Sequence, residues 1–246
     1  MASFKAVFVP VAYSLIFLLG VIGNVLVLVI LERHRRSSTE TFLFHLAVAD
    51  LLLVFILPFA VAEGSVGWVL GTFLCKTVIA LHKVNFYCSS LLLACIAVDR
   101  YLAIVHRRLL SIHITCGTIW LVGFLLALPE ILFHAWFTSR FLYHVAGFLL
   151  PMLVMGWCYV GVVHRRQKAV RVAILVTSIF FLCWSPYHIV IFLDTLARLK
   201  AVAITMCEFL GLAHCCLNPM LYTFAGVKFR SDLSRLLTKL GCTGPA

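Results

Sequence analysis

Seven long apolar runs constrain the fold of this chain more than any other feature of its sequence. An α-helix needs roughly 20 apolar residues to cross a hydrocarbon core about 30 Å thick. None of the runs alternates between polar and apolar residues as the strands of a membrane β-barrel do. The sequence therefore predicts an all-α membrane protein, a seven-transmembrane helix bundle with spans at 6–31, 41–62, 74–98, 109–129, 141–164, 172–193 and 201–224.

Composition and charge place the chain in lipid and orient it. Only 12% of the 246 residues are charged, about half the share found in soluble domains. Most of the 20 lysines and arginines lie at one set of span ends, around Arg33, Arg100, Lys168 and Arg230. Because cytoplasmic ends carry such an excess, we expect an extracellular N-terminus and a cytoplasmic C-terminus. The formal charge of +11 thus reports topology and contact with membrane lipid, not a nucleic-acid partner.

Several joins between the runs are too short for the turn that antiparallel helices require. Phe133 leads to His134 and Trp136 without turn residues, and the joins near Arg165 and Lys200 are almost as abrupt. A helical hairpin needs about 2–5 loop residues. We infer that connecting residues are missing from this chain, so its numbering understates the separations between spans.

A change of pattern after the seventh run divides the chain. Residues 1–226 form the predicted seven-helix domain, and residues 227–246 form a juxtamembrane helix and a C-terminal stub. In the second segment the apolar residues share one helical face, opposite the charged ones: Phe229, Leu233, Leu236, Leu237 and Leu240. This pattern is typical of an amphipathic helix that lies along the inner membrane surface.

Polar side chains inside the apolar runs are candidates for function, because such groups are costly in lipid unless they have partners. Asp50 lies near mid-membrane, where it can meet Asn218 of the seventh run. Asn85 and Ser89 of the third run lie at the same depth. Their oxygen atoms suit either a hard monovalent cation or a network of waters.

An acid and a base, Asp99 and Arg100, stand side by side where the third run meets the cytoplasm. We interpret them as an arginine held by its neighbouring carboxylate and released on demand. An arginine that merely anchors the helix end is the alternative. In the sixth run Pro186 follows Trp184 by two residues, and its missing amide makes a hinge possible there, with a simple packing kink as the alternative.

Cys75 lies at the extracellular end of the third run, where oxidation permits a disulfide. Its partner is expected in the connection after the fourth run, which is absent from this chain. A free thiol is the alternative. The other cysteines are scattered without paired metal-ligand spacing, and most are expected to be small buried residues.

Taken in order, these residues resemble the motifs of the rhodopsin-like (class A) G-protein-coupled receptors. The matching residues occur in every run: Asn24, Asp50, Asp99, Arg100, Tyr101, Trp120, Pro151, Tyr159, Trp184, Pro186, Asn218, Pro219 and Tyr222. Within that class the chain is similar to the chemokine receptors. The features that it shares with them are DRYLAIV at 99–105, the outer loop from Trp68 to Cys75, His214 before two cysteines, and the stretch 226–230.

The resemblance implies a plasma-membrane receptor that binds an extracellular CXC chemokine and directs lymphocyte migration. It implies an inhibitory-class heterotrimeric G protein and arrestin as cytoplasmic partners. Chemokines are basic, so acidic side chains towards the outer ends of the runs would receive them. We expect Glu208, Asp194 and Glu63 to bind the ligand, with Lys83 and Tyr187 beside them. Glu208 is the favoured anchor because it lies inside an apolar run.

The resemblance also implies a switch between two packed states. Ligand binding would bias Trp184 and the Pro186 hinge, and the sixth helix would swing outward to free Arg100 for a G protein. The other predicted members of the switch are Asp99, Tyr101, Tyr159, Asn218, Pro219 and Tyr222. A sodium ion held by Asp50, Asn85, Ser89 and Asn218 would favour the inactive state, and no cofactor is required.

Other functions fit the sequence less well. A transporter predicts repeated halves, which the chain does not show. A light-driven pump would need a Schiff-base lysine in the seventh run, and 201–227 holds none. An intramembrane metallohydrolase would need paired ligand spacing, whereas His82, His188 and His214 lie in separate runs. We therefore expect a receptor and not an enzyme, with another peptide ligand as the main alternative to a chemokine.

Overall fold

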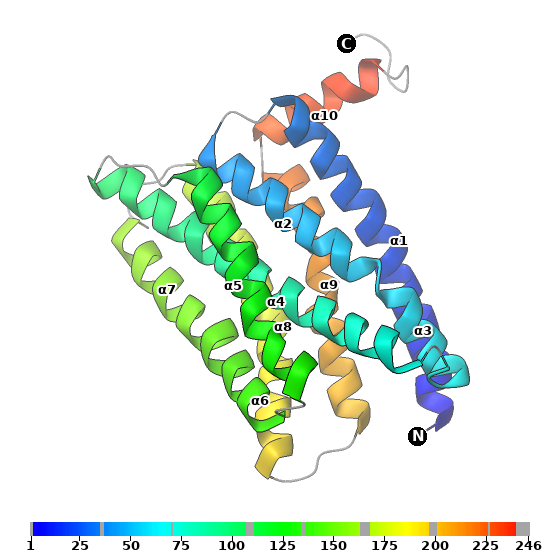
Figure 1. Cartoon of the computed structure of the whole chain (residues 1–246). Coiled ribbons are helices and arrows are strands. Elements are labelled where there is room, and N and C mark those ends of the chain that lie inside the picture. Colours follow the sequence, from blue (N-terminus) through cyan, green and yellow to red (C-terminus); the bar gives the residue numbers. More distant parts are fainter. Residues whose placement is uncertain are drawn as a thin grey trace.

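The computed structural model describes residues 2–34, 37–69, 71–106, 111–133, 136–162, 168–196, 201–225 and 227–239, and every regular element in these ranges is a helix (Figure 1). Seven helical segments are long and apolar enough to cross a membrane, which confirms the predicted bundle. They are formed by α1 (Ala2–His34), α2 (Ser38–Val54) with α3 (Leu57–Val66), α4 (Gly71–Tyr101) with η1 (Leu102–His106), α5 (Ile112–Phe133), α6 (Trp136–His144) with η2 (Val145–Leu149) and α7 (Leu150–Val162), α8 (Lys168–Leu196) and α9 (Ala201–Ala225).

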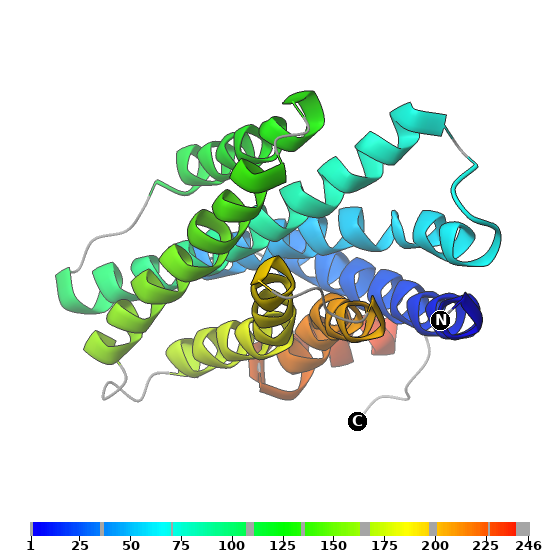
Figure 2. The same ribbon diagram turned by 90° about the horizontal axis from the view of Figure 1, so that it is seen from below.

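Helix α4 runs obliquely through the middle of the bundle, as the view from below shows (Figure 2). It packs against α2, α5, α7 and α8. Every side chain from Val84 to Ser90 is buried, because other helices surround this stretch. Other helices expose apolar side chains such as Leu153 and Val160 of α7, as expected for segments whose solvent is lipid.

The prolines affect their spans differently. Pro58 lies in the first turn of α3, and α2 ends at Val54, so the second span is interrupted between Val54 and Leu57. A proline lacks the amide that would continue the hydrogen-bonded ladder. Pro186 and Pro219 lie inside α8 and α9, which continue past them.

The fifth span changes its hydrogen-bond register at η2, a π-helical turn. Such a turn leaves a backbone carbonyl without its usual partner. The Ser90 hydroxyl of α4 donates to the Gly147 carbonyl at 2.6 Å. Glycine suits position 147, because a Cβ there would lie 2.7 Å from the Phe86 ring. Ser90 and Gly147 together fix the fifth span against α4.

The Ser90→Ala variant is expected to unfold at a lower temperature than the wild type in detergent. Loss of this hydroxyl would leave a buried carbonyl unsatisfied, at a cost of about 1–3 kcal/mol. Thr118→Ala is the matched control, because the Thr118 hydroxyl binds the Ile114 carbonyl of its own helix on an exposed face. Equal unfolding temperatures for the two variants would contradict the role assigned to Ser90.

Helix α10 (Val227–Lys239) lies across the end of the bundle, near the end of α1 (Figure 1). Its Phe229 side chain is buried, with the ring 6.3 Å from that of Tyr222 in α9. Arg230 and Arg235 are exposed. The helix thus has the amphipathic character that the sequence predicts, and residues 240–246 lie outside the described part of the chain.

Candidate ligand pocket and switch

Three predicted ligand-binding residues gather around a tyrosine of α1. Glu208 of α9 is half-buried and accepts a hydrogen bond from the Tyr13 hydroxyl. Glu63 of α3 and Tyr187 of α8 lie near enough to Tyr13 to interact with it electrostatically. Sequence reasoning missed Tyr13, whose only signal is a phenol inside the first apolar run.

The other two predicted ligand-binding residues, Asp194 and Lys83, lie on α8 and α4. Asp194 has a cationic partner, and Lys83 has an aromatic one. The Asp194 carboxylate of α8 lies 3.6 Å from Arg140 of α6, and their side chains are 22% and 23% exposed. The Lys83 ammonium of α4 lies 5.0 Å from the centre of the Tyr143 ring, in a cation–π contact. The predicted set is therefore split into an acidic group around Tyr13 and a second group, Asp194 and Lys83, whose partners Arg140 and Tyr143 lie on α6.

Trp184 connects the outer residues to the interior of the bundle. Its fully buried indole lies 5.7 Å from the Tyr187 ring and 5.7 Å from the His214 ring, measured between ring centres. Gly211 faces the indole, and a Cβ at that position would lie 2.9 Å from a ring carbon. A line of aromatic contacts therefore runs from Tyr187 through Trp184 to His214.

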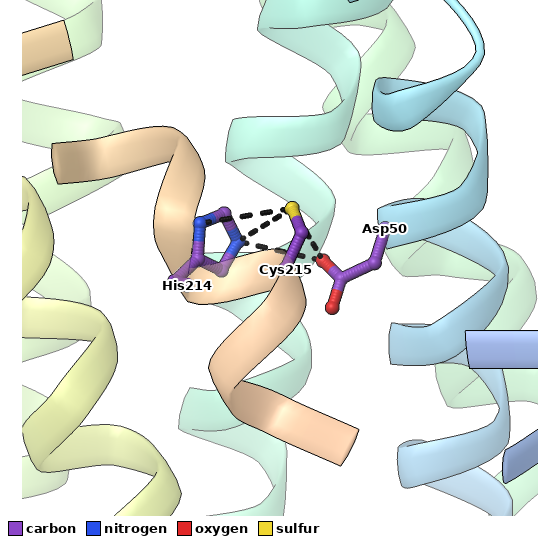
Figure 3. A group of neighbouring side chains, drawn as sticks. All are labelled: Asp50, His214 and Cys215. Carbon is purple, nitrogen blue, oxygen red and sulfur yellow. Dashed lines mark hydrogen bonds and ion pairs between the residues drawn. The ribbon is translucent and has the colours of Figure 1, made fainter. Parts of the chain in front are cut away.

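A polar centre surrounds Asp50 below Trp184. The Asn218 amide donates to Asp50 Oδ2 at 2.9 Å, as the sequence predicts. The other carboxylate oxygen, Oδ1, faces two side chains of α9 that the prediction did not include (Figure 3). His214 Nε2 lies 3.4 Å from it, and the Cys215 thiol donates to it at 3.5 Å. All four side chains are almost completely buried.

The predicted sodium ligands are only partly brought to Asp50. Asn85 donates its amide hydrogen to the Ala49 carbonyl at 2.7 Å, beside Asp50 and not to its carboxylate. Three buried oxygen atoms of these predicted ligands have no hydrogen-bond partner in the described part of the chain: Asn85 Oδ1, Ser89 Oγ and Asn218 Oδ1. Unpartnered oxygen atoms of this kind fit a hard cation, although the atoms that touch Asp50 Oδ1 are nitrogen and sulfur.

The acid–base pair at the opposite end of α4 forms a closed contact. Arg100 pairs with the buried Asp99 carboxylate and donates to the Ser38 hydroxyl at 2.9 Å. Ser38 in turn donates to Asp99 at 2.7 Å. Ser38 lies in the first turn of α2, which begins with a capping box between Ser37 and Glu40. The predicted pair is therefore a three-residue lock, of which Ser38 was missed.

Three tyrosines of the predicted switch contact different helices. Tyr101 packs on Gly161 of α7, where a Cβ would lie 2.7 Å from the tyrosine ring. The Tyr159 hydroxyl of α7 lies 3.0 Å from that of Thr177 in α8. Tyr222 is buried beside α10, and its hydroxyl has no hydrogen-bond partner among the described residues. In α9 Pro219 packs against α1.

The chain matches the family model described as "7 transmembrane receptor (rhodopsin family)" over residues 23–142 and 137–222. The chain belongs to this receptor family. It is 82% identical over 301 residues to "C-X-C chemokine receptor type 5" of Homo sapiens, covering 100% of this chain and 81% of that protein. It is 76% identical to the Mus musculus protein of the same name, of which it covers 80%. "C-X-C chemokine receptor type 3" of Bos taurus is 42% identical over 289 residues, covering 98% of this chain and 79% of that protein.

These relatives place the receptor among the class A chemokine receptors and confirm the predicted resemblance. The predicted seven-helix architecture agrees with them. Membership of this family favours a receptor over the transporter and the light-driven pump that were the alternatives. His188 and His214 do not share a metal site: His188 Nδ1 lies 2.8 Å from His144 Nδ1, whereas His214 contacts Asp50.

The comparisons also bear on the short joins of this receptor. The alignment with the human relative covers 301 residues, although the chain has 246. The relative therefore carries residues inside the matched region that this chain lacks. The family match is itself divided near residues 137–142, next to the join after Phe133. Both observations agree with the inferred loss of connecting residues.

Cys75 is a partly buried free thiol that forms no disulfide with the other described cysteines. Its predicted partner belongs to the missing connection after the fourth span, so the disulfide stays a prediction.

Proposed function

We propose that this receptor binds a CXC chemokine at its outer face and activates an inhibitory-class heterotrimeric G protein at the Arg100 end, thereby directing lymphocyte migration. The proposed site is the plasma membrane, with the N-terminus outside and α10 along the inner leaflet. Arrestin is the second proposed cytoplasmic partner. The lock of Arg100 with Asp99 and Ser38 is the main support for the proposal, because these two side chains hold a partly buried arginine and could release it.

Charge supports the outer site. Chemokines are basic, and an acid held inside an apolar helix gains most from a cationic partner. Glu208 is such an acid, and Tyr13 holds it in place. Glu63 is exposed, and its charge would mainly increase the rate at which the basic chemokine associates with the receptor. Asp194 already faces Arg140, so a ligand cation would have to displace that guanidinium. Glu208 is therefore the main anchor.

The aromatic contacts connect the outer site to the polar centre around Asp50. Tyr187, Trp184 and His214 are in successive contact, and His214 lies beside Asp50. A ligand that favours one arrangement of these rings would shift the population of the two packed states. Release of Arg100 would accompany movement of α8, to which Tyr159 is hydrogen-bonded through Thr177. A sodium ion near Asp50, held by the unpartnered oxygens of the polar centre, would favour the locked state.

An Arg100→Ala variant tests the proposal. Chemokine binding at the cell surface is expected to persist, while chemokine-stimulated nucleotide exchange on the G protein should be lost. Arg33→Ala is the matched control, because Arg33 is an exposed arginine near the same end of the bundle. Persistent exchange in Arg100→Ala at equal surface expression would refute the assigned role of the lock.

A further inference from the structure

The polar centre includes a nitrogen atom and a sulfur atom beside Asp50 Oδ1, which the sodium ion proposed above does not use. Asp50 Oδ1, His214 Nε2 and Cys215 Sγ face one another, and the three side chains come from facing turns of α2 and α9 (Figure 3). The nitrogen–oxygen distance is 3.4 Å, the sulfur–oxygen distance is 3.5 Å and the sulfur–nitrogen distance is 3.6 Å. All three side chains are fully buried.

When its imidazole is neutral, the hydrogen bonding of His214 leaves two acceptors facing each other. Its Nδ1 lies 2.6 Å from the Gly211 carbonyl, which can only accept, so Nδ1 donates. In a neutral imidazole the lone pair is then on Nε2, which faces the Asp50 carboxylate. The single thiol hydrogen of Cys215 can satisfy only one of these two groups. A cation between them would satisfy both.

The distances fit a transition-metal ion. Zinc lies about 2.0–2.2 Å from nitrogen and oxygen ligands and about 2.3 Å from sulfur. The edges of a zinc tetrahedron are then about 3.3 Å between nitrogen and oxygen and about 3.6 Å from sulfur to either atom. We infer that Asp50, His214 and Cys215 form a binding site for Zn²⁺ in the interior of the bundle.

At these three atoms, chemistry and charge support zinc over a hard ion. Imidazole and thiolate ligands favour zinc or copper, whereas sodium and magnesium prefer oxygen alone. Binding would form Zn–O, Zn–N and Zn–S bonds and release the thiol proton to solvent. The charges of carboxylate, thiolate and Zn²⁺ then cancel, so the membrane interior holds a neutral group. A water or the unpartnered Asn218 Oδ1 can supply the fourth ligand.

The surrounding hydrogen bonds are those that metal ligands usually have. Metal-bound histidines donate their other nitrogen to a carbonyl or carboxylate, as His214 does to Gly211. Asn218 donates to Asp50 Oδ2 and leaves Oδ1 turned towards α9. Zinc would link α2 to α9 beside Trp184. If the proposed function holds, it would stabilise the locked conformation.

Cobalt absorption tests the site without any signalling assay. The purified receptor is expected to bind one equivalent of Co²⁺ with a thiolate-to-cobalt band in the near ultraviolet and the strong visible bands of tetrahedral cobalt. Zn²⁺ should displace the ion, and Mg²⁺ should not. Cys215→Ser should lose the near-ultraviolet band and at least about tenfold in affinity. Asp50→Asn, which keeps the shape of the site, should weaken binding as well.

Cys216→Ser is the matched control, because the Cys216 thiol donates to the Ile16 carbonyl of α1 at 3.4 Å and points away from the cluster. It should bind cobalt as the wild type does. The inference is overturned if the wild type gives no thiolate band at one equivalent, if Mg²⁺ displaces cobalt as well as Zn²⁺ does, or if Cys216→Ser removes the band. These outcomes are independent of chemokine binding and G-protein activation.

Discussion

Replacing Glu208 with glutamine is expected to raise the chemokine concentration for half-maximal G-protein activation by about thirtyfold or more. Removing one partner of a desolvated charge pair costs about 2–5 kcal/mol, and each 1.4 kcal/mol is about tenfold in affinity. Glutamine can still accept the Tyr13 hydrogen bond, so the contact between α1 and α9 at this point should persist. Dose–response curves for nucleotide exchange, at matched surface expression, measure the effect.

Glu63→Gln is the control for Glu208→Gln. Glu63 belongs to the same acidic group around Tyr13 but is exposed, so its charge is screened by solvent. Its loss should change the half-maximal concentration by less than about fivefold. Equal effects of the two substitutions would show that the outer acids act only through their summed charge. Glu208 would then not be an anchor.

Asp99→Asn is expected to raise nucleotide exchange in the absence of chemokine by about tenfold. Hydrogen bonds to charged groups contribute about 1.5–3 kcal/mol, and here the bond holds a mostly buried arginine in the locked state. Weakening it shifts the population towards the state in which Arg100 is free. Basal exchange on purified G protein, with receptor in lipid discs, measures the shift.

Ser38→Ala should raise basal exchange by a smaller factor, because a neutral hydrogen bond contributes about 0.5–1.5 kcal/mol. Thr39→Val is the matched control, since the Thr39 hydroxyl has no hydrogen-bond partner in the ranges that the structure describes. It should leave basal exchange unchanged. An effect of Thr39→Val as large as that of Ser38→Ala would assign the change to the start of α2 and not to the lock.

The sequence predicts the spans well because helix length and hydrophobicity are local properties. The amphipathic pattern of α10 is also local, and it was predicted. The depth of a residue in the membrane can be predicted nearly as well, because it follows from the position of that residue within its apolar run. Asp50 and Asn218 were expected to meet for that reason, and they do.

Rotation of each helix about its own axis could not be predicted, and most of the missed residues depend on it. Which side of α9 faces Asp50 decides whether His214 and Cys215 join the polar centre. A lone histidine and a cysteine in an apolar run carry no spacing signal. Tyr13 was missed for the same reason, because its partner lies on the last span.

The partners of charged residues could not be predicted from the sequence either. Asp194 was expected to bind the ligand, but in the structure it pairs with Arg140 of α6. Ser38 and Asp99 lie 61 residues apart, and only the packing of α2 on α4 brings them together. Such contacts depend on the relative placement of two helices, which no single run determines.

The most direct test of the account is nucleotide exchange on an inhibitory-class G protein in response to a panel of CXC chemokines and unrelated peptide agonists. It should use this chain and a version with the connecting segments of the human relative restored. The account predicts that at least one CXC chemokine, and none of the unrelated peptides, stimulates exchange by the restored receptor, and that Glu208→Gln weakens the response. A response to an unrelated peptide alone, or none from either receptor at confirmed surface expression, would contradict it.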